Sequence, residues 1–77
     1  MRVKVIPPFG SSRKALDERG WMELPEGAKV LDVLRKIRCG PVKAKLLLVS
    51  VNGERAGLTQ TLHDGDVVGF FAPVAGG

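Results

Sequence analysis

Few side chains in this sequence of 77 residues could do acid–base or nucleophilic chemistry, because it holds one histidine, His63, and one cysteine, Cys39. His63 precedes Asp64-Gly65, a turn signal, so a solvated turn residue is favoured over a proton-transfer role. A single cysteine with no histidine near it in the sequence is not a nucleophile constellation, and it makes neither an intrachain disulfide nor a zinc cluster. We therefore expect no bound metal and no bound cofactor.

The C-terminus offers a different chemistry, because the chain ends in Ala75-Gly76-Gly77. With average glycine usage, two terminal glycines arise by chance in about 0.5% of chains. Glycine has no Cβ, so such an end can enter a narrow channel and present its carboxylate. That carboxylate can attack the α-phosphate of a nucleotide, and a sulfur or amine nucleophile can then displace AMP. Gly77 is the predicted reactive residue, and a partner would supply the catalytic groups.

Two strands at the start of the chain are predicted from the side-chain pattern. Arg2–Ile6 alternates strictly, with Val3 and Val5 on the buried face. Residues 9–20 are polar and bounded by glycine, which indicates a long loop with room for one helical turn over 14–19. Trp21–Leu24 then forms a short second strand.

The middle of the chain predicts one amphipathic helix. Apolar residues recur on one face, at Val30, Leu31, Leu34 and Ile37. This helix of about ten residues would begin at 28 or 29 and end before Gly40-Pro41. Asp32 stands at the spacing that allows an ion pair with Lys36.

Three further strands follow the helix. The apolar run 46–51 predicts a central strand that ends at the turn Asn52-Gly53. Residues 55–58 form a weak edge strand. The last strand covers 67–72, where alternation directs Phe70 to the core and Phe71 to solvent.

This order of elements predicts an α+β fold in which one main helix packs on a mixed sheet of four to five strands. It is the pattern of a β-grasp fold, in which the first and last strands pair in parallel at the centre of the sheet. We expect residues 1–72 to form this domain and residues 73–77 to form a flexible C-terminal Gly-Gly tail.

Charge and hydropathy restrict the partners. The formal net charge is +4, and a basic cluster without acidic residues covers Arg35, Lys36, Arg38, Lys43 and Lys45. No aromatic residues are interleaved with it, so an acidic protein partner is favoured over nucleic acid, and an ordinary solvated charged surface is the other interpretation. The longest apolar run, 46–49, is too short to span a bilayer, so we expect no membrane insertion. With no signal-like segment and one cysteine, we expect a cytoplasmic protein.

A family resemblance rests on the last sixteen residues, LHDGDVVGFFAPVAGG from Leu62 to Gly77, supported by Val51-Asn52-Gly53-Glu54 and by Lys4-Val5-Ile6 followed by Phe9 and Arg13. These motifs resemble the small subunit of molybdopterin synthase, the MoaD-type carriers of the ubiquitin-like MoaD/ThiS sulfur carrier family. The resemblance implies a non-catalytic subunit of a synthase complex.

The resemblance also implies what happens to the tail. A ubiquitin-activating-type adenylyltransferase uses ATP to adenylate Gly77, and sulfur from a donor protein converts Gly77 to a thiocarboxylate. The large subunit of molybdopterin synthase then receives the tail, and the sulfur builds the dithiolene of the molybdenum or tungsten cofactor. Pro73, Val74, Ala75 and Gly76 would thread the partner's site, and Phe71 and Phe9 would form the docking surface.

Three alternatives remain open. A ThiS-type carrier would use the same tail chemistry but deliver sulfur for the thiazole of thiamin. A ubiquitin-like modifier would join the Gly77 carboxylate to an amine in an isopeptide bond. The third is a non-reactive β-grasp interaction domain.

Overall fold

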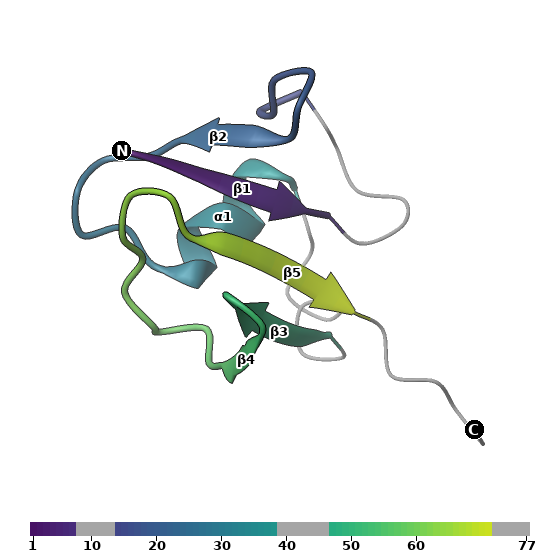
Figure 1. The fold of residues 1–77 in the computed structure, drawn as a ribbon, viewed down its shortest axis with the longest axis vertical. Helices are drawn as coiled ribbons and strands as arrows, with labels where there is room; N and C mark the ends of the chain where they lie inside the picture. Colours follow the sequence, from purple (N-terminus) through teal and green to yellow (C-terminus); the bar gives the residue numbers. More distant parts are fainter. Residues whose placement is uncertain (8–13, 39–46, 72–77) are drawn as a thin grey trace.

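The computed structural model describes residues 1–7, 14–38 and 47–71. These residues form β1 (Arg2–Ile6), β2 (Trp21–Glu23), α1 (Val30–Lys36), β3 (Leu48–Val51), β4 (Glu54–Ala56) and β5 (Val67–Phe71). The five strands make one sheet in the order β2-β1-β5-β3-β4, and α1 covers one face of it (Figure 1). The predicted α+β fold of β-grasp type is confirmed.

The two ends of the described chain meet at the centre of the sheet. β1 pairs with β5 in parallel, with Val5 opposite Val68 and Ile6 opposite Gly69. β5 also pairs antiparallel with β3, so it has a neighbour on each side, whereas β2 and β4 are the edges. The parallel pairing of first and last strands is therefore confirmed, and β5 is paired with β1 as far as Gly69 and with β3 as far as Phe71.

The core lies between the sheet and α1. Its buried apolar side chains come from every strand except β4, from α1, and from the segments next to α1 and between β4 and β5: Val3, Val5, Met22, Leu24, Ala28, Val30, Val33, Leu34, Ile37, Val49, Val51, Leu62, Val68 and Phe70. No polar side chain is buried among the described residues. Apolar burial is thus the main source of stability for this small domain.

α1 is shorter than predicted, because it ends at Lys36. Ile37 caps the helix, and Arg38 takes a left-handed conformation with φ of 57°, which stops the helix before Gly40. Asp32 stabilises the start, since its Oδ2 accepts a hydrogen bond of 2.8 Å from the backbone N–H of Lys29. Asp32 pairs with Arg35 at 3.6 Å and not with Lys36, whose Nζ donates to the carbonyl of Glu23.

Turns replace the helical turn that was expected over residues 14–19. The Oδ1 atom of Asp17 accepts hydrogen bonds from the backbone N–H groups of Arg19, at 2.8 Å, and Trp21, at 2.9 Å. An aspartate that bonds to the backbone ahead of it competes with helix formation. The same hydrogen bonds fix the backbone at Trp21, where β2 begins.

The turn Asn52-Gly53 joins β3 to β4 and also contacts the start of β5. Both residues have positive φ, 54° and 83°, as a two-residue hairpin of type I′ requires. The Asn52 side chain donates to Asp66 Oδ1 and accepts from the backbone N–H of Val67, each at 2.9 Å. This side chain therefore fixes where β5 begins.

Candidate functional site

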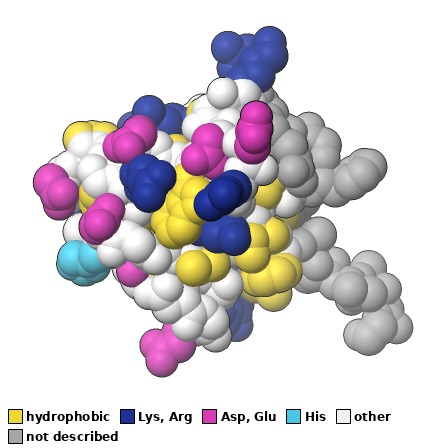
Figure 2. All heavy atoms as spheres, turned by 45° about the horizontal axis from the view of Figure 1, so that its top comes forward, with side chains coloured by type: hydrophobic (Ala, Val, Ile, Leu, Met, Phe, Trp, Pro, Cys, Tyr) yellow, Lys and Arg dark blue, Asp and Glu magenta, His cyan; other side chains and the backbone are white. Residues whose placement is uncertain are grey.

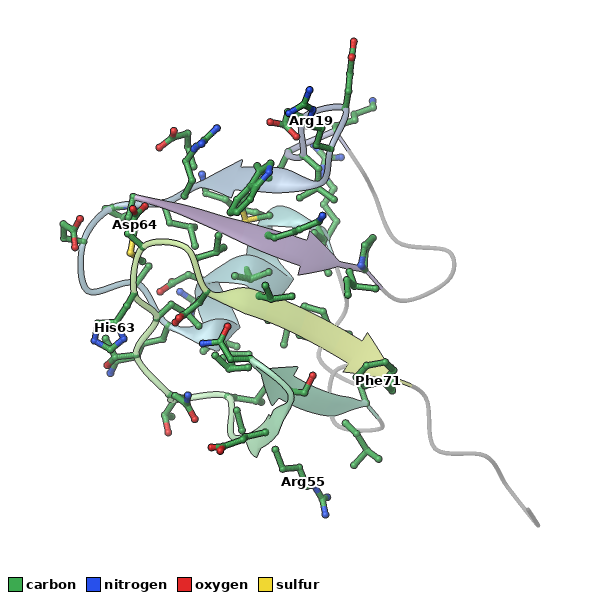
Figure 3. All side chains as sticks on the ribbon, viewed as in Figure 1. Arg19, Arg55, His63, Asp64 and Phe71 are labelled. Carbon is green, nitrogen blue, oxygen red and sulfur yellow. The ribbon has the colours of Figure 1, made fainter. Side chains whose placement is uncertain are left out.

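Phe71 ends the central strand and points away from the core. Alternation along β5 buries Phe70, which is 3% exposed, and leaves Phe71 51% exposed. Both positions confirm the prediction that Phe70 faces the core and Phe71 faces solvent. Phe71 lies at the end of β5 (Figure 3), six residues before Gly77 in the sequence.

Other apolar side chains surround Phe71 on the sheet face opposite α1. Leu48 is its partner in the β3–β5 register, and Ile6 stands opposite Gly69 in the β1–β5 register. Ile6 is 49% exposed and Leu48 is 38% exposed. We call Ile6, Leu48 and Phe71 the Phe71 patch. Exposed apolar side chains that gather on one face are typical of a protein-binding surface.

Basic residues flank the Phe71 patch. Arg2 and Lys4 precede Ile6 on the same face of β1, and Arg55 stands opposite Ser50 on β4. Among the described strand residues, Glu23 is the one acidic residue on this face, and it stands opposite Arg2. The Arg2 guanidinium lies 5.2 Å from the centre of the Trp21 ring.

Figure 2 shows hydrophobic side chains and Lys or Arg side chains next to one another in the middle of the view, with Asp and Glu side chains around them. The charge balance of the sheet face favours a partner with acidic groups around an apolar contact.

The other predicted site residues lie outside the described residues. These are Phe9, the tail residues Pro73, Val74, Ala75, Gly76 and Gly77, and Lys43 and Lys45 of the basic cluster. Their roles, and the boundary between residues 1–72 and the tail, stay predictions. Arg35, Lys36 and Arg38 are described and exposed.

Two members of the patch, Ile6 and Leu48, were not among the predicted docking residues. Strand alternation already placed Ile6 outward together with Arg2 and Lys4. Exposure alone did not single it out, because scattered exposed apolar residues are common. What joins Ile6 and Leu48 to Phe71 is the strand order, which brings β1 and β3 to the two sides of β5.

His63 lies away from the patch, at the other end of the sheet (Figure 3). Its side chain is exposed, its backbone N–H donates to Asp66 Oδ2 at 2.8 Å, and its Nδ1 is 3.9 Å from that same oxygen. His63 is therefore a solvated turn residue, as expected. Over residues 1–7, 14–38 and 47–71, no group of three or more potential metal ligands comes together.

A cavity of about 250 Å³ lies between β1 and the turns that precede β2, lined by Val5, Ile6, Pro7, Leu16, Asp17, Glu18, Arg19 and Gly20. The Asp17 carboxylate at this cavity already accepts backbone hydrogen bonds. Those bonds, above all the one from Trp21, hold the pKa of Asp17 below its ordinary value. The carboxylate organises the turn and offers little to a ligand.

Comparison with known families sets this geometry in context. The model of the ThiS family matches residues 9–77. The chain belongs to the ThiS family. No curated protein sequence matches the chain. Within the described part of the chain, α1 is the one helix, and it is too short to cross a membrane.

The solved structures that resemble this ThiS-family chain include those of two archaeal proteins. One, from Pyrococcus furiosus, is provisionally named molybdopterin converting factor, subunit 1; it is 32% identical, covers 95% of both chains and has a TM-score of 0.61. The other, SAMP1 from Haloferax volcanii, is 21% identical, with 99% of this chain and 97% of that one covered and a TM-score of 0.62. At that identity, SAMP1 supports the shared fold alone.

Proposed function

We propose that this ThiS-family protein is a sulfur carrier of molybdopterin biosynthesis and acts as the small subunit of a molybdopterin synthase. The family match that continues through residue 77 carries this proposal, because it includes the glycine tail. The relative from Pyrococcus furiosus, at 32% identity over 95% of both chains, favours molybdopterin as the product. The proposed site of action is the cytoplasm.

The proposed chemistry takes place at the Gly77 carboxylate. One carboxylate oxygen attacks the α-phosphorus of ATP in a partner adenylyltransferase, and pyrophosphate leaves. The terminal sulfur of a persulfide on a donor protein then attacks the acyl carbon, and AMP leaves with the oxygen that it had bonded. A thiol next attacks the donor-side sulfur of the resulting acyl disulfide, loses its proton, forms a disulfide with the donor and releases the sulfur that stays on Gly77. The product is a thiocarboxylate, which the large subunit of molybdopterin synthase uses as its sulfur source.

The domain would contribute position, not catalysis. β5 is paired with β1 as far as Gly69 and with β3 as far as Phe71, so a partner that binds the Phe71 patch also fixes the origin of residues 72–77. These six residues span at most about 20 Å when extended. In this proposal, Phe71 and Phe9 dock outside the partner while 73–77 thread to its reaction site.

Intact mass spectrometry tests this function after co-expression with an adenylyltransferase and a sulfur source. Replacement of one oxygen by sulfur, localised to Gly77 by fragmentation, is the expected result. Adducts on lysines of other proteins would indicate a protein modifier instead. An unchanged mass with no adducts would contradict both and leave an interaction domain.

The thiazole synthase of thiamin biosynthesis is a second candidate sulfur acceptor, because the matching family model is that of ThiS. A transfer experiment compares the two acceptors. The thiocarboxylated protein is mixed with either the large subunit of molybdopterin synthase or a thiazole synthase. We expect the first to bind it and remove the sulfur. Sulfur transfer to the thiazole synthase alone would assign the protein to thiamin biosynthesis.

A further inference from the structure

Gly69 occupies an unusual position, the middle of the central strand β5. Glycine weakens a strand interior and there usually marks a bulge or a close approach. No bulge interrupts β5 here, since Gly69 pairs in register with Ile6 on one side and Ser50 on the other. Its φ lies outside the left-handed region, so the backbone conformation does not require glycine.

Glycine at position 69 leaves room for the side chains of its neighbours. A Cβ at position 69 would lie 3.1 Å from Cζ and 3.2 Å from Cε2 of Phe71, and 3.1 Å from Oγ of Ser50. Ordinary van der Waals contacts of a Cβ are 3.4–4 Å. The ring of Phe71 therefore folds back along the strand and rests on the backbone of Gly69.

We propose that Gly69 is a positioning residue that seats the Phe71 ring for docking to the adenylyltransferase. This inference rests on the proposed function and adds to it the residue that sets the orientation of the docking aromatic. Without a side chain at 69, the ring lies over Gly69, which is flanked by Ile6 on β1 and Ser50 on β3. A side chain at 69 lifts the ring and changes the shape of the Phe71 patch.

The substitution Gly69→Ala separates this role from a purely structural one. The atoms that the new methyl group would meet are the ends of two rotatable side chains, so Phe71 and Ser50 move aside and the chain still folds. Alanine also reduces the conformational freedom of the unfolded chain. We therefore expect unfolding midpoints in denaturant at or above those of the wild type.

Docking is expected to weaken in the same variant. With ATP and the adenylyltransferase, Gly69→Ala should raise the KM for the carrier about fivefold or more and leave kcat unchanged, because a displaced ring alters binding and not the reacting carboxylate. The matched control is Gly57→Ala. Gly57 also has an ordinary φ, and a Cβ there meets nothing within 4 Å, so its KM should stay at the wild-type value.

A double-mutant cycle shows whether Gly69 acts through Phe71. In a Phe71→Ala background, Gly69→Ala should have no further effect on KM. A persistent effect would mean that the new methyl group contacts the partner directly, which contradicts the proposal. Ser50→Ala combined with Gly69→Ala removes the contact with Ser50 Oγ, and the raised KM should remain.

Two outcomes separate this inference from the proposed function. If the wild type is activated but Gly69→Ala behaves as Gly57→Ala does, the positioning role is wrong and the function stands. If no adenylyltransferase activates the wild type, the proposed function fails. Nuclear Overhauser contacts then show whether the Phe71 ring rests on Gly69. Contacts between the Phe71 ring protons and the Gly69 Hα protons support this position of the ring, and their absence overturns it.

Discussion

Adjacent aromatic residues at the end of β5 have opposite surroundings, since Phe70 is 3% exposed and Phe71 is 51% exposed. Phe70→Ala removes a large side chain from the core, and we expect it to lower the free energy of unfolding by about 3–5 kcal/mol. Phe71→Ala removes an exposed ring, so its cost should be about 1 kcal/mol or less. Urea unfolding of both variants measures the difference.

Affinity for the adenylyltransferase should depend on the exposed Phe71 and not on the buried Phe70. Phe71→Ala is expected to weaken binding to the adenylyltransferase, measured by isothermal titration calorimetry on the folded variant. Leu48→Ala, next to Phe71 in the register, should weaken it too, because both belong to the Phe71 patch. Wild-type affinity in both variants would show that the partner binds elsewhere.

Asp17 gives the fold a pH dependence at the residue scale. Backbone hydrogen bonds, the largest from Trp21 and others from Arg19 and Gly20, together with the charge of Arg2, lower its pKa from the ordinary 3.8 against a smaller desolvation effect. A carboxyl group with a lowered folded-state pKa stabilises the fold above the unfolded pKa and loses this contribution as pH falls through the folded pKa.

We therefore expect Asp17→Ala to be less stable than the wild type at neutral pH. The difference in free energy of unfolding between the two proteins should narrow as the pH falls below the ordinary pKa of 3.8. Chemical unfolding of both proteins at a series of pH values measures it. A gap of constant size down to the lowest pH at which both fold would contradict this assignment.

At the scale of elements, the turn Asn52-Gly53 links the β3–β4 hairpin to β5. Asn52 combines a φ of 54° with two side-chain hydrogen bonds, to Asp66 and from Val67. Asn52→Gly keeps the conformation but loses both bonds, so we expect it to cost about 1–2 kcal/mol. Asn52→Ala also strains the backbone and should cost about 1 kcal/mol more.

Thermal unfolding of the two variants separates these contributions. Equal stability of Asn52→Gly and Asn52→Ala would mean that the positive φ carries no strain. Asn52→Gly as stable as the wild type would mean that the two hydrogen bonds contribute nothing to the placement of β5.

Strands were easier to predict than the helix and the turns for a physical reason. Alternation reports which side of a strand faces the core, so it identified β1 residue by residue and separated Phe70 from Phe71. The end of α1 depends on a left-handed Arg38, and the turns before β2 depend on the Asp17 carboxylate; neither leaves a periodic signal. The Phe71 patch and the seat at Gly69 needed the strand order, because they combine β1, β3 and β5.

At the scale of the whole molecule, the basic flank of the Phe71 patch should assist association. Arg2, Lys4 and Arg55 are exposed on the sheet face that carries Phe71. Lys4→Glu is expected to slow association with the adenylyltransferase, and added salt should reduce the difference, because exposed charges are screened. Stopped-flow association rates measure this effect. Lys14→Glu, a change of the same charge on a residue outside the sheet, is the control.

Among the described residues, the last side chain of the core is that of Phe70, so we expect Gly77 to matter for chemistry and not for folding. Deletion of Gly77 is expected to leave the unfolding midpoint unchanged, as measured by circular dichroism in denaturant. A clear loss of stability would show that the tail packs on the domain, against the predicted division at residue 72.

Adenylation of the Gly77 carboxylate is the central claim, and exchange of labelled pyrophosphate into ATP by the adenylyltransferase reports it most directly. We predict exchange that depends on the wild-type carrier, disappears when Gly77 is deleted, and needs a higher concentration of carrier with Phe71→Ala. Exchange that continues unchanged without Gly77, or that never depends on the carrier, would contradict the account.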